Sequence, residues 1–219
     1  MVEAAKSLLL IVTALFPIVD PLGGSPIFLA LTREYASDAR KELSRRIAIN
    51  SFFLLVGSYL IGTYILAFFG ISLPVVQVGG GLIVISTGWA MLKQKTDEEH
   101  TVTRRNVRRQ DPFGRAFYPL TMPLTVGPGS ISVAVTLGAN THRHGLNLLA
   151  IVVALAGSGL IAYSIFLCYG FADRLARMLG ATAMTVIMQL ASFLLVCIGV
   201  QILWNGASAL LASVPIAAP

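Results

Sequence analysis

The sequence has 219 residues, of which 56% are hydrophobic and 12% are charged, with a mean hydropathy of +0.79. Soluble domains carry about 25% charged residues, so this composition excludes the soluble, disordered and fibrous classes and indicates a lipid-embedded chain. The two cysteines, Cys168 and Cys197, lie in apolar runs and provide neither a disulfide framework nor a cysteine-based metal site. The net charge of +6 is informative only through its distribution among the loops.

Six apolar stretches approach the length of about 20 residues that a membrane-spanning helix needs. They cover residues 8–31, 47–69, 71–92, 116–137, 146–171 and 183–211. The sequence therefore predicts an all-α, polytopic membrane protein with six transmembrane helices. The first span is expected to be retained, because no small-residue cleavage site follows it.

The sixteen basic residues lie outside these spans or at their edges. Fourteen of them fall in the loops after the first, third and fifth spans, and only Lys6 and Arg143 fall on the other side. This positive-inside bias predicts a protein of the cell (inner) membrane with both termini outside the cytoplasm. The arginine pairs at 104–105 and 108–109 are expected to set topology and to contact anionic headgroups rather than nucleic acid.

A motif in the first span recurs in the fourth. Residues 16–26 read FPIVDPLGGSP and residues 118–128 read YPLTMPLTVGP, so that three prolines, a leucine and an aromatic residue coincide at a shift of 102. Each copy opens a block of three spans, and three is odd, so the second block enters the membrane from the opposite side, as in inverted-repeat transporters. We expect an N-terminal three-span repeat at 1–92, a cytoplasmic basic linker at 93–115 and a C-terminal three-span repeat at 116–219.

The prolines also predict that the first and fourth spans are broken near mid-membrane, since three prolines within about ten residues cannot occupy one regular helix. Glycines around 23–26 and 126–130 add freedom to unwind there. Non-helical backbone at this depth must be buried in protein or line a wet cavity, so the two broken segments should face each other. Each restarted half-helix would offer free N–H groups to a carboxylate, from Ser25 and from 127–130. The alternative is that the prolines only kink the helices for packing.

One acidic residue, Asp20, lies inside a predicted span, between Pro17 and Pro21. Placing an ionised carboxylate there costs roughly 2.5 to 3.5 kcal/mol, and no predicted span contains a Lys, Arg or His to offset it. Asp20 should therefore be protonated, hydrogen-bonded to unwound backbone, bound to a metal ion or paired with a positive group on a ligand. A structural alternative is that Asp20 caps the broken helix.

An acceptor at Asp20 beside two half-helix N-termini makes a site with both polarities, which fits a small zwitterion such as an amino acid. Proton coupling through Asp20 is compatible with this site, because burial disfavours the charged form of a carboxyl. Sodium held by unwound carbonyls is compatible as well.

The stretches FPIVDPLGGSPIFLALT at 16–32 and FYPLTMPLTVGPGSISVAVTLG at 117–138 resemble the MarC family of integral membrane proteins, and the likeness extends over nearly the whole chain. The resemblance implies a six-span transporter with inverted repeats whose broken first and fourth spans bind substrate; members include small neutral amino acid transporters. The family usually has Asn where this chain has Asp20, which leaves the coupling ion open. The expected substrate-binding residues are Asp20, Pro21, Gly23, Gly24, Ser25, Thr125, Gly127, Gly129 and Ser130, with Asp20 also serving the coupling ion.

The sequence thus predicts a secondary transporter of small neutral amino acids of the glycine, alanine and serine class, coupled to protons or sodium. Its partners would be that substrate, the ion and the lipid bilayer, without nucleic acid, and homo-oligomerisation is left open. No enzyme activity, cofactor or metal is expected, because a single intramembrane Asp is insufficient for catalysis. The alternatives are a thiol-relay membrane electron carrier, although Cys168 and Cys197 are far from the breaks in sequence, and a non-transporting membrane subunit.

Overall fold

The computed structural model of the chain describes residues 2–32, 35–93, 116–143 and 148–213. Within these ranges the chain is helical and contains no β-strand, which confirms the all-α prediction for that part. The helices are α1 (Val2–Val19), α2 (Pro21–Leu31), α3 (Ser37–Phe68), α4 (Leu73–Lys93), the π-helical segment η2 (Ala116–Thr125), α5 (Pro128–Arg143), α6 (Leu148–Gly170) and α7 (Ala172–Ala212). The predicted basic linker at 93–115 lies, apart from Lys93, outside the described residues.

Five stretches in the described part of the chain are long and apolar enough to cross a membrane: Ala4–Leu29, Ser37–Phe68, Leu73–Lys93, Leu148–Gly170 and Thr185–Ala212. A sixth candidate consists of Ala116–Thr125 and Pro128–Thr141, which are bent by 70° relative to each other. These stretches overlap the six spans predicted from hydropathy. A count of six holds if the bent pair is one span.

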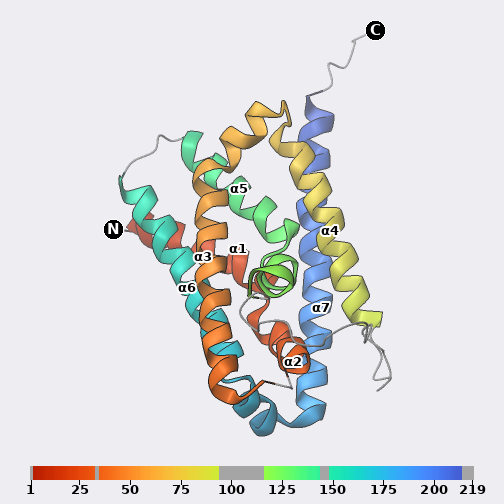
Figure 1. The fold of residues 1–219 in the computed structure, drawn as a ribbon. Helices are drawn as coiled ribbons and strands as arrows, with labels where there is room; N and C mark the ends of the chain where they lie inside the picture. Colours follow the sequence, from red (N-terminus) through yellow and green to blue (C-terminus); the bar gives the residue numbers. More distant parts are fainter. Residues whose placement is uncertain (1, 33–34, 94–115, 144–147, 214–219) are drawn as a thin grey trace.

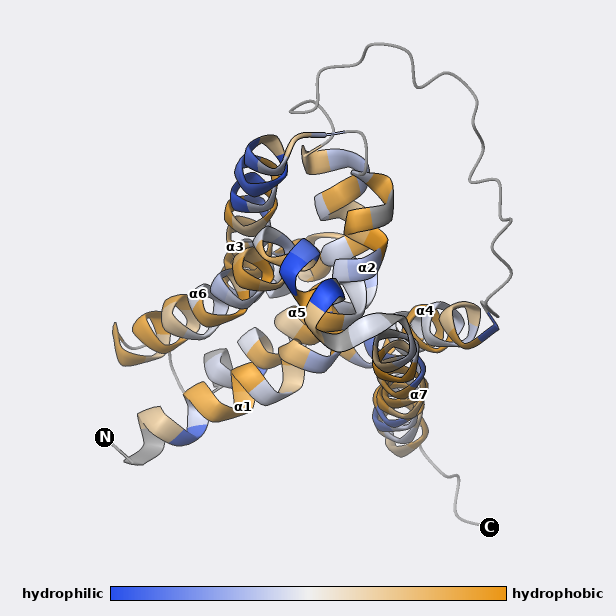
Figure 2. Cartoon of the chain, turned by 90° about the horizontal axis from the view of Figure 1, so that it is seen from below, coloured by the Kyte–Doolittle hydropathy of each residue, from blue (hydrophilic) through white to orange (hydrophobic). Residues whose placement is uncertain are grey.

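The helices form two lateral pairs with the interrupted segments between them. Helix α4 packs along α7, and α3 packs along α6. Seen along the bundle, α3 and α6 lie on one side, α4 and α7 lie on the other, and α1, α2 and α5 lie between the pairs (Figures 1 and 2). The two interrupted spans therefore occupy the centre of the molecule.

Glycines allow α4 and α7 to approach closely. A Cβ atom added at Gly81 would lie 2.7 Å from the backbone nitrogen of Leu203, and one at Gly206 would lie 2.7 Å from the carbonyl oxygen of Pro74. Small residues at such positions let backbones approach, which favours helix association in lipid, where apolar burial gives little driving force. The α4–α7 pair thus depends on backbone proximity.

The side chains divide into a buried core and a large apolar exterior. Fully buried core residues come from the central segments and the α3–α6 pair: Leu15, Phe28, Leu43, Ile47, Leu55, Val126, Ile161, Ile165 and Tyr169. Large apolar side chains are exposed on the outer helices: Phe53, Phe68, Leu148, Leu190, Phe193 and Trp204. A contiguous apolar exterior of this extent is typical of a surface that faces lipid.

The first span is interrupted at Asp20 alone. Helix α1 ends at Val19, Asp20 adopts a left-handed conformation (φ 44°, ψ 63°), and Pro21 begins α2. The expectation that the chain unwinds around 23–26 is wrong, because this stretch is helical. The Ser25 hydroxyl donates to the Leu22 carbonyl oxygen at 2.8 Å, which is the carbonyl that the missing N–H of Pro26 would have bonded.

The fourth span is interrupted more extensively. Tyr118 and Met122 within η2 have extended backbone angles, and the chain bends before α5 begins at Pro128. A proline at the first position of the restarted helix agrees with the prediction from its fixed φ and absent donor. The bend thus lies at Val126 and Gly127, within the predicted stretch, whereas the extended backbone at Tyr118 and Met122 lies before that stretch.

Candidate functional site

Asp20 uses one carboxylate oxygen to cap the helix that follows it. Its Oδ1 accepts a hydrogen bond from the Gly23 backbone N–H at 3.0 Å, and its carbonyl oxygen accepts one from the Gly24 N–H at 2.9 Å. The capping alternative raised by the sequence is thus present. Since Asp20 satisfies these donors, the start of α2 offers less to an external anion than the sequence predicted.

The other carboxylate oxygen, Oδ2, is buried and has no hydrogen-bond partner among the described residues. A buried polar atom without a partner carries a desolvation cost of about 1–3 kcal/mol, and more if it is charged. A proton on this oxygen, a cation or an ammonium group of a ligand would offset that cost. Asp20 therefore combines a structural oxygen with an available one.

Tyr169 of α6 lies between the two interrupted segments. Its hydroxyl is 3.1 Å from Thr125 Oγ1 at the end of η2, and its ring stacks on Phe28 of α2 with centroids 4.7 Å apart. The hydroxyl also lies against Gly24, where any Cβ atom would collide with it. Tyr169, fully buried, thereby connects the first predicted half of the site with Thr125 of the second.

Threonine hydroxyls satisfy carbonyl groups in the irregular fourth span. Thr121 Oγ1 donates to the Ala116 carbonyl oxygen at 2.6 Å, and Thr125 Oγ1 donates to that of Leu120 at 2.7 Å. Asn50 of α3 approaches Thr121 Oγ1 at 3.4 Å. Buried non-helical backbone needs such partners, so the threonines stabilise the interruption.

The start of α5 has the geometry of a helix N-terminus. Ser130 Oγ and the Ile131 N–H both donate to the Gly127 carbonyl oxygen, at 2.9 and 3.1 Å. The N–H groups of Gly129 and Ser130 belong to the first turn, where a helix supplies no intrahelical acceptor. A side chain at Gly129 would collide with Val84 of α4, so the backbone is close-packed on that side.

The predicted site residues are therefore brought together in part. Gly24 and Thr125 both contact Tyr169, and the Asp20 carbonyl oxygen accepts a hydrogen bond from the Gly24 N–H. Gly129 instead packs on α4. Sequence reasoning missed Tyr169, because its partners lie far along the chain. The sequence also does not distinguish it from Tyr163 on the same helix, which is exposed in the structure.

Cys168 directly precedes Tyr169, whose hydroxyl lies against Gly24, so Cys168 is on the turn of α6 that meets the first interrupted span. Both cysteines are free, and Cys197 is exposed on α7. In the described part of the chain, no three His, Cys, Asp or Glu side chains gather in a way that could hold a metal ion.

The helical fold, the apolar exterior and the interrupted central spans define an integral membrane protein. The MarC family integral membrane protein profile matches residues 5–211. The chain belongs to the MarC family.

Related proteins agree over nearly their full lengths. The chain is 32% identical to the UPF0056 inner membrane protein MarC of Citrobacter koseri and to that of Salmonella typhimurium, covering 94% of this chain and 96% of each relative. A UPF0056 membrane protein of Archaeoglobus fulgidus is 29% identical and covers 89% of both chains. No solved structure matches the chain.

Proposed function

We propose that this protein is a secondary transporter of small neutral amino acids of the glycine, alanine and serine class, driven by protons or sodium. The observation that carries the proposal is the buried, unpartnered Oδ2 of Asp20 among the described residues, at an interruption that Tyr169 connects to Thr125 of the fourth span. An intramembrane carboxylate in this setting is by default a functional group.

The proposal assigns opposite ends of the substrate to the two interruptions. Asp20 Oδ2 receives the ammonium group or the coupling ion, and the first N–H groups of α5, at Gly129 and Ser130, receive the carboxylate. Pro21, Gly23, Ser25 and Gly127 shape the backbone around these groups. The restriction to small side chains is argued from the small residues around both interruptions, which leave little room for a bulky substrate.

An inverted repeat with an interrupted span in each half is part of the proposal, and the packing supports it. In such a repeat, α1, α2, α3 and α4 correspond to η2, α5, α6 and α7. The contacts of α2 with α6 and α7 then correspond to those of α5 with α3 and α4, and the α1–α6 contact corresponds to η2–α3. All of these contacts are present. At the shift of 102 residues, Asp20 corresponds to Met122, and both have non-helical backbone angles. This pattern favours repeats at 1–92 and 116–219, joined by the linker at 93–115.

The test is uptake by the full chain reconstituted in liposomes. Labelled glycine or alanine should accumulate under an imposed proton or sodium gradient. Failure to take up or bind any small amino acid would reject the transport function. Asp20→Asn retains the Oδ1 acceptor that caps α2 and should change the pH dependence of uptake, whereas Asp20→Leu should abolish uptake. Asp38→Asn, at an exposed position of α3, is the control.

A thiol-relay electron carrier is the second candidate, because Cys168 directly precedes Tyr169, the residue that meets Gly24 of the first interrupted span. Such a carrier needs two exchanging thiols, so the double variant Cys168→Ser/Cys197→Ser separates the two functions. The transporter proposal expects uptake to persist in this variant. Loss of a thiol-dependent activity without any uptake in the parent protein would favour the carrier.

A further inference from the structure

An apolar groove with a volume of about 460 Å³ lies between α3 and α6, away from the interrupted spans. Its lining combines aromatic and aliphatic side chains with one charged residue: Arg45, Ala48, Ile49, Phe52, Phe53, Ala162, Tyr163 and Phe166. The groove is open to the exterior, and Phe53 and Tyr163 are 66% and 59% exposed. Because this exterior faces lipid, the groove is accessible from the bilayer.

The charged end of the groove lies at the expected depth of the lipid headgroups. Helix α3 has no charged residue from Ile47 to its end at Phe68. At a rise of about 1.5 Å per residue, this stretch measures roughly 33 Å, close to the hydrocarbon thickness of about 30 Å. Arg45 and Arg46 directly precede the stretch, so the Arg45 guanidinium reaches the boundary where headgroup phosphates lie.

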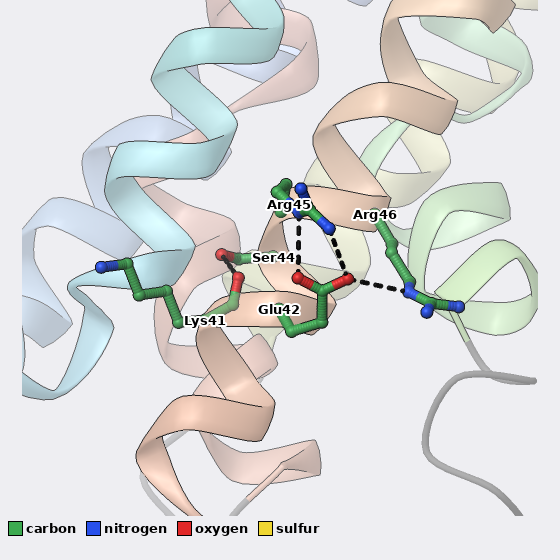
Figure 3. Close-up of polar contacts among 5 residues, drawn as sticks. All are labelled: Lys41, Glu42, Ser44, Arg45 and Arg46. Carbon is green, nitrogen blue, oxygen red and sulfur yellow. Dashed lines mark hydrogen bonds and ion pairs between the residues drawn. The ribbon is translucent and has the colours of Figure 1, made fainter.

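Arg45 belongs to a cationic cluster, formed by Arg45 and Arg46 around one carboxylate, Glu42, whereas the Lys41 side chain points away from that carboxylate (Figure 3). Arg45 donates two hydrogen bonds of 2.9 Å to Glu42, and Arg46 donates one of 3.2 Å. Two cations against one carboxylate leave the cluster positive, and the Arg45 and Arg46 side chains are 62% and 46% exposed. The cluster can therefore hold Arg45 at the groove end while its net charge attracts an anion.

We propose that this groove binds an anionic phospholipid, with an acyl chain against Phe52 and Phe166 and the phosphate at Arg45. Lipid tails are as apolar as the groove lining, so apolar contact alone gives no preference among lipids. The preference among lipids is therefore set by the headgroup, because the positive cluster favours a headgroup with net negative charge. This site is distinct from the transport proposal and does not depend on it.

The experiment measures lipid binding to the delipidated full-length protein in detergent by native mass spectrometry. The probes are phosphatidylglycerol and phosphatidylcholine with identical acyl chains, and inorganic phosphate. Phosphatidylglycerol should bind about fivefold more tightly than phosphatidylcholine, the effect of one basic residue near an anionic headgroup. Equal binding of the two lipids, or equal occupancy by inorganic phosphate, would overturn the proposal.

Two pairs of variants locate the site. Arg45→Gln should remove the preference for phosphatidylglycerol, whereas Arg177→Gln, on an exposed position of α7, should retain it. Ile49→Trp fills the groove and should weaken both lipids, whereas Ile61→Trp, elsewhere on the exposed face of α3, should not. Equal losses within either pair contradict the proposal. So does a dimer that Ile49→Trp dissociates without changing lipid binding, since a second copy would then occupy the groove.

Discussion

Tyr169 and Gly24 pack directly against each other at the centre of the molecule. The Tyr169 hydroxyl fills the space that a Cβ atom at Gly24 would need and bonds to Thr125 at 3.1 Å. The glycine is therefore required by the tyrosine and not by its own backbone angles, which are helical. A Cβ atom at position 24 should therefore be tolerated only if the Tyr169 hydroxyl is removed or displaced.

We predict that Gly24→Ala destabilises the protein by about 1–3 kcal/mol, as overpacking does in a close-packed core. Tyr169→Phe should cost about 0.5–1.5 kcal/mol for the lost hydrogen bond. The double variant should lose less unfolding free energy than the two single variants lose together, because the hydroxyl that meets the new Cβ atom is gone. Thermal unfolding of all four proteins in one detergent measures this coupling, and strict additivity would contradict it.

At the scale of helices, Ser25 explains why α2 continues through a proline. The Leu22 carbonyl would be left without its helical donor by Pro26, and the Ser25 hydroxyl supplies one at 2.8 Å. Ser58 of α3 also donates its hydroxyl to a carbonyl, that of Leu54, at 2.7 Å, but this carbonyl keeps its helical donor, the backbone N–H of Ser58 itself. The two serines thus differ in whether their acceptor has another donor, and Ser25 is the more buried of the two.

Ser25→Ala should therefore destabilise the protein by about 1–3 kcal/mol, the cost of leaving the Leu22 carbonyl of this part-buried hydrogen bond unsatisfied. Ser58→Ala should change the unfolding free energy by less than about 0.5 kcal/mol, since alanine suits a helix interior. Denaturant or thermal unfolding of the two variants in parallel gives the comparison. Equal effects would show that the Leu22 carbonyl has another donor.

The helix pattern could be predicted from the sequence, whereas the positions of the interruptions could be predicted only in part. Hydropathy located the spans because lipid requires long apolar helices, and Pro128 located the start of α5. The first interruption was placed at 23–26 because the rule for proline does not include a neighbouring hydroxyl that replaces the lost donor. Tyr169 was not identified because helix periodicity does not show which face of α6 meets the interrupted segments.

Helix α4 provides a test of the close packing against α7. Gly81→Ala should destabilise the protein by about 1–3 kcal/mol, because the new Cβ atom meets backbone atoms of α7 that cannot rotate away. Gly79→Ala, two residues earlier, should be neutral or stabilising by up to about 1 kcal/mol, since no described atom lies within 4 Å of its Cβ position and alanine favours a helix. Unfolding temperatures in detergent distinguish the two, and a neutral Gly81→Ala would contradict the packing.

At the scale of the whole molecule, the basic residues gather at one end of the bundle. The start of α3, the end of α4, the end of α6 and the start of α7 lie together at the lower end in Figure 1. The hydrophilic part of α3 is this same end (Figure 2). Arg40 of α3 bonds Asp173 of α7 there at 2.7 Å, which connects the two proposed halves. Other basic residues on these helix ends are Lys41, Arg45, Arg46, Lys93, Arg174 and Arg177.

This charge asymmetry predicts the orientation of the protein in its membrane. Basic helix ends are retained in the cytoplasm, so the lower end in Figure 1 should be cytoplasmic and both termini should lie outside. A green fluorescent protein fused after Pro219 should remain dark, and alkaline phosphatase at the same point should be active. The same reporters inserted into the 94–115 segment should behave in the opposite way, which also controls for expression. A fluorescent fusion after Pro219 would reverse the orientation, and matching signals from the two sites would contradict an odd number of crossings between them.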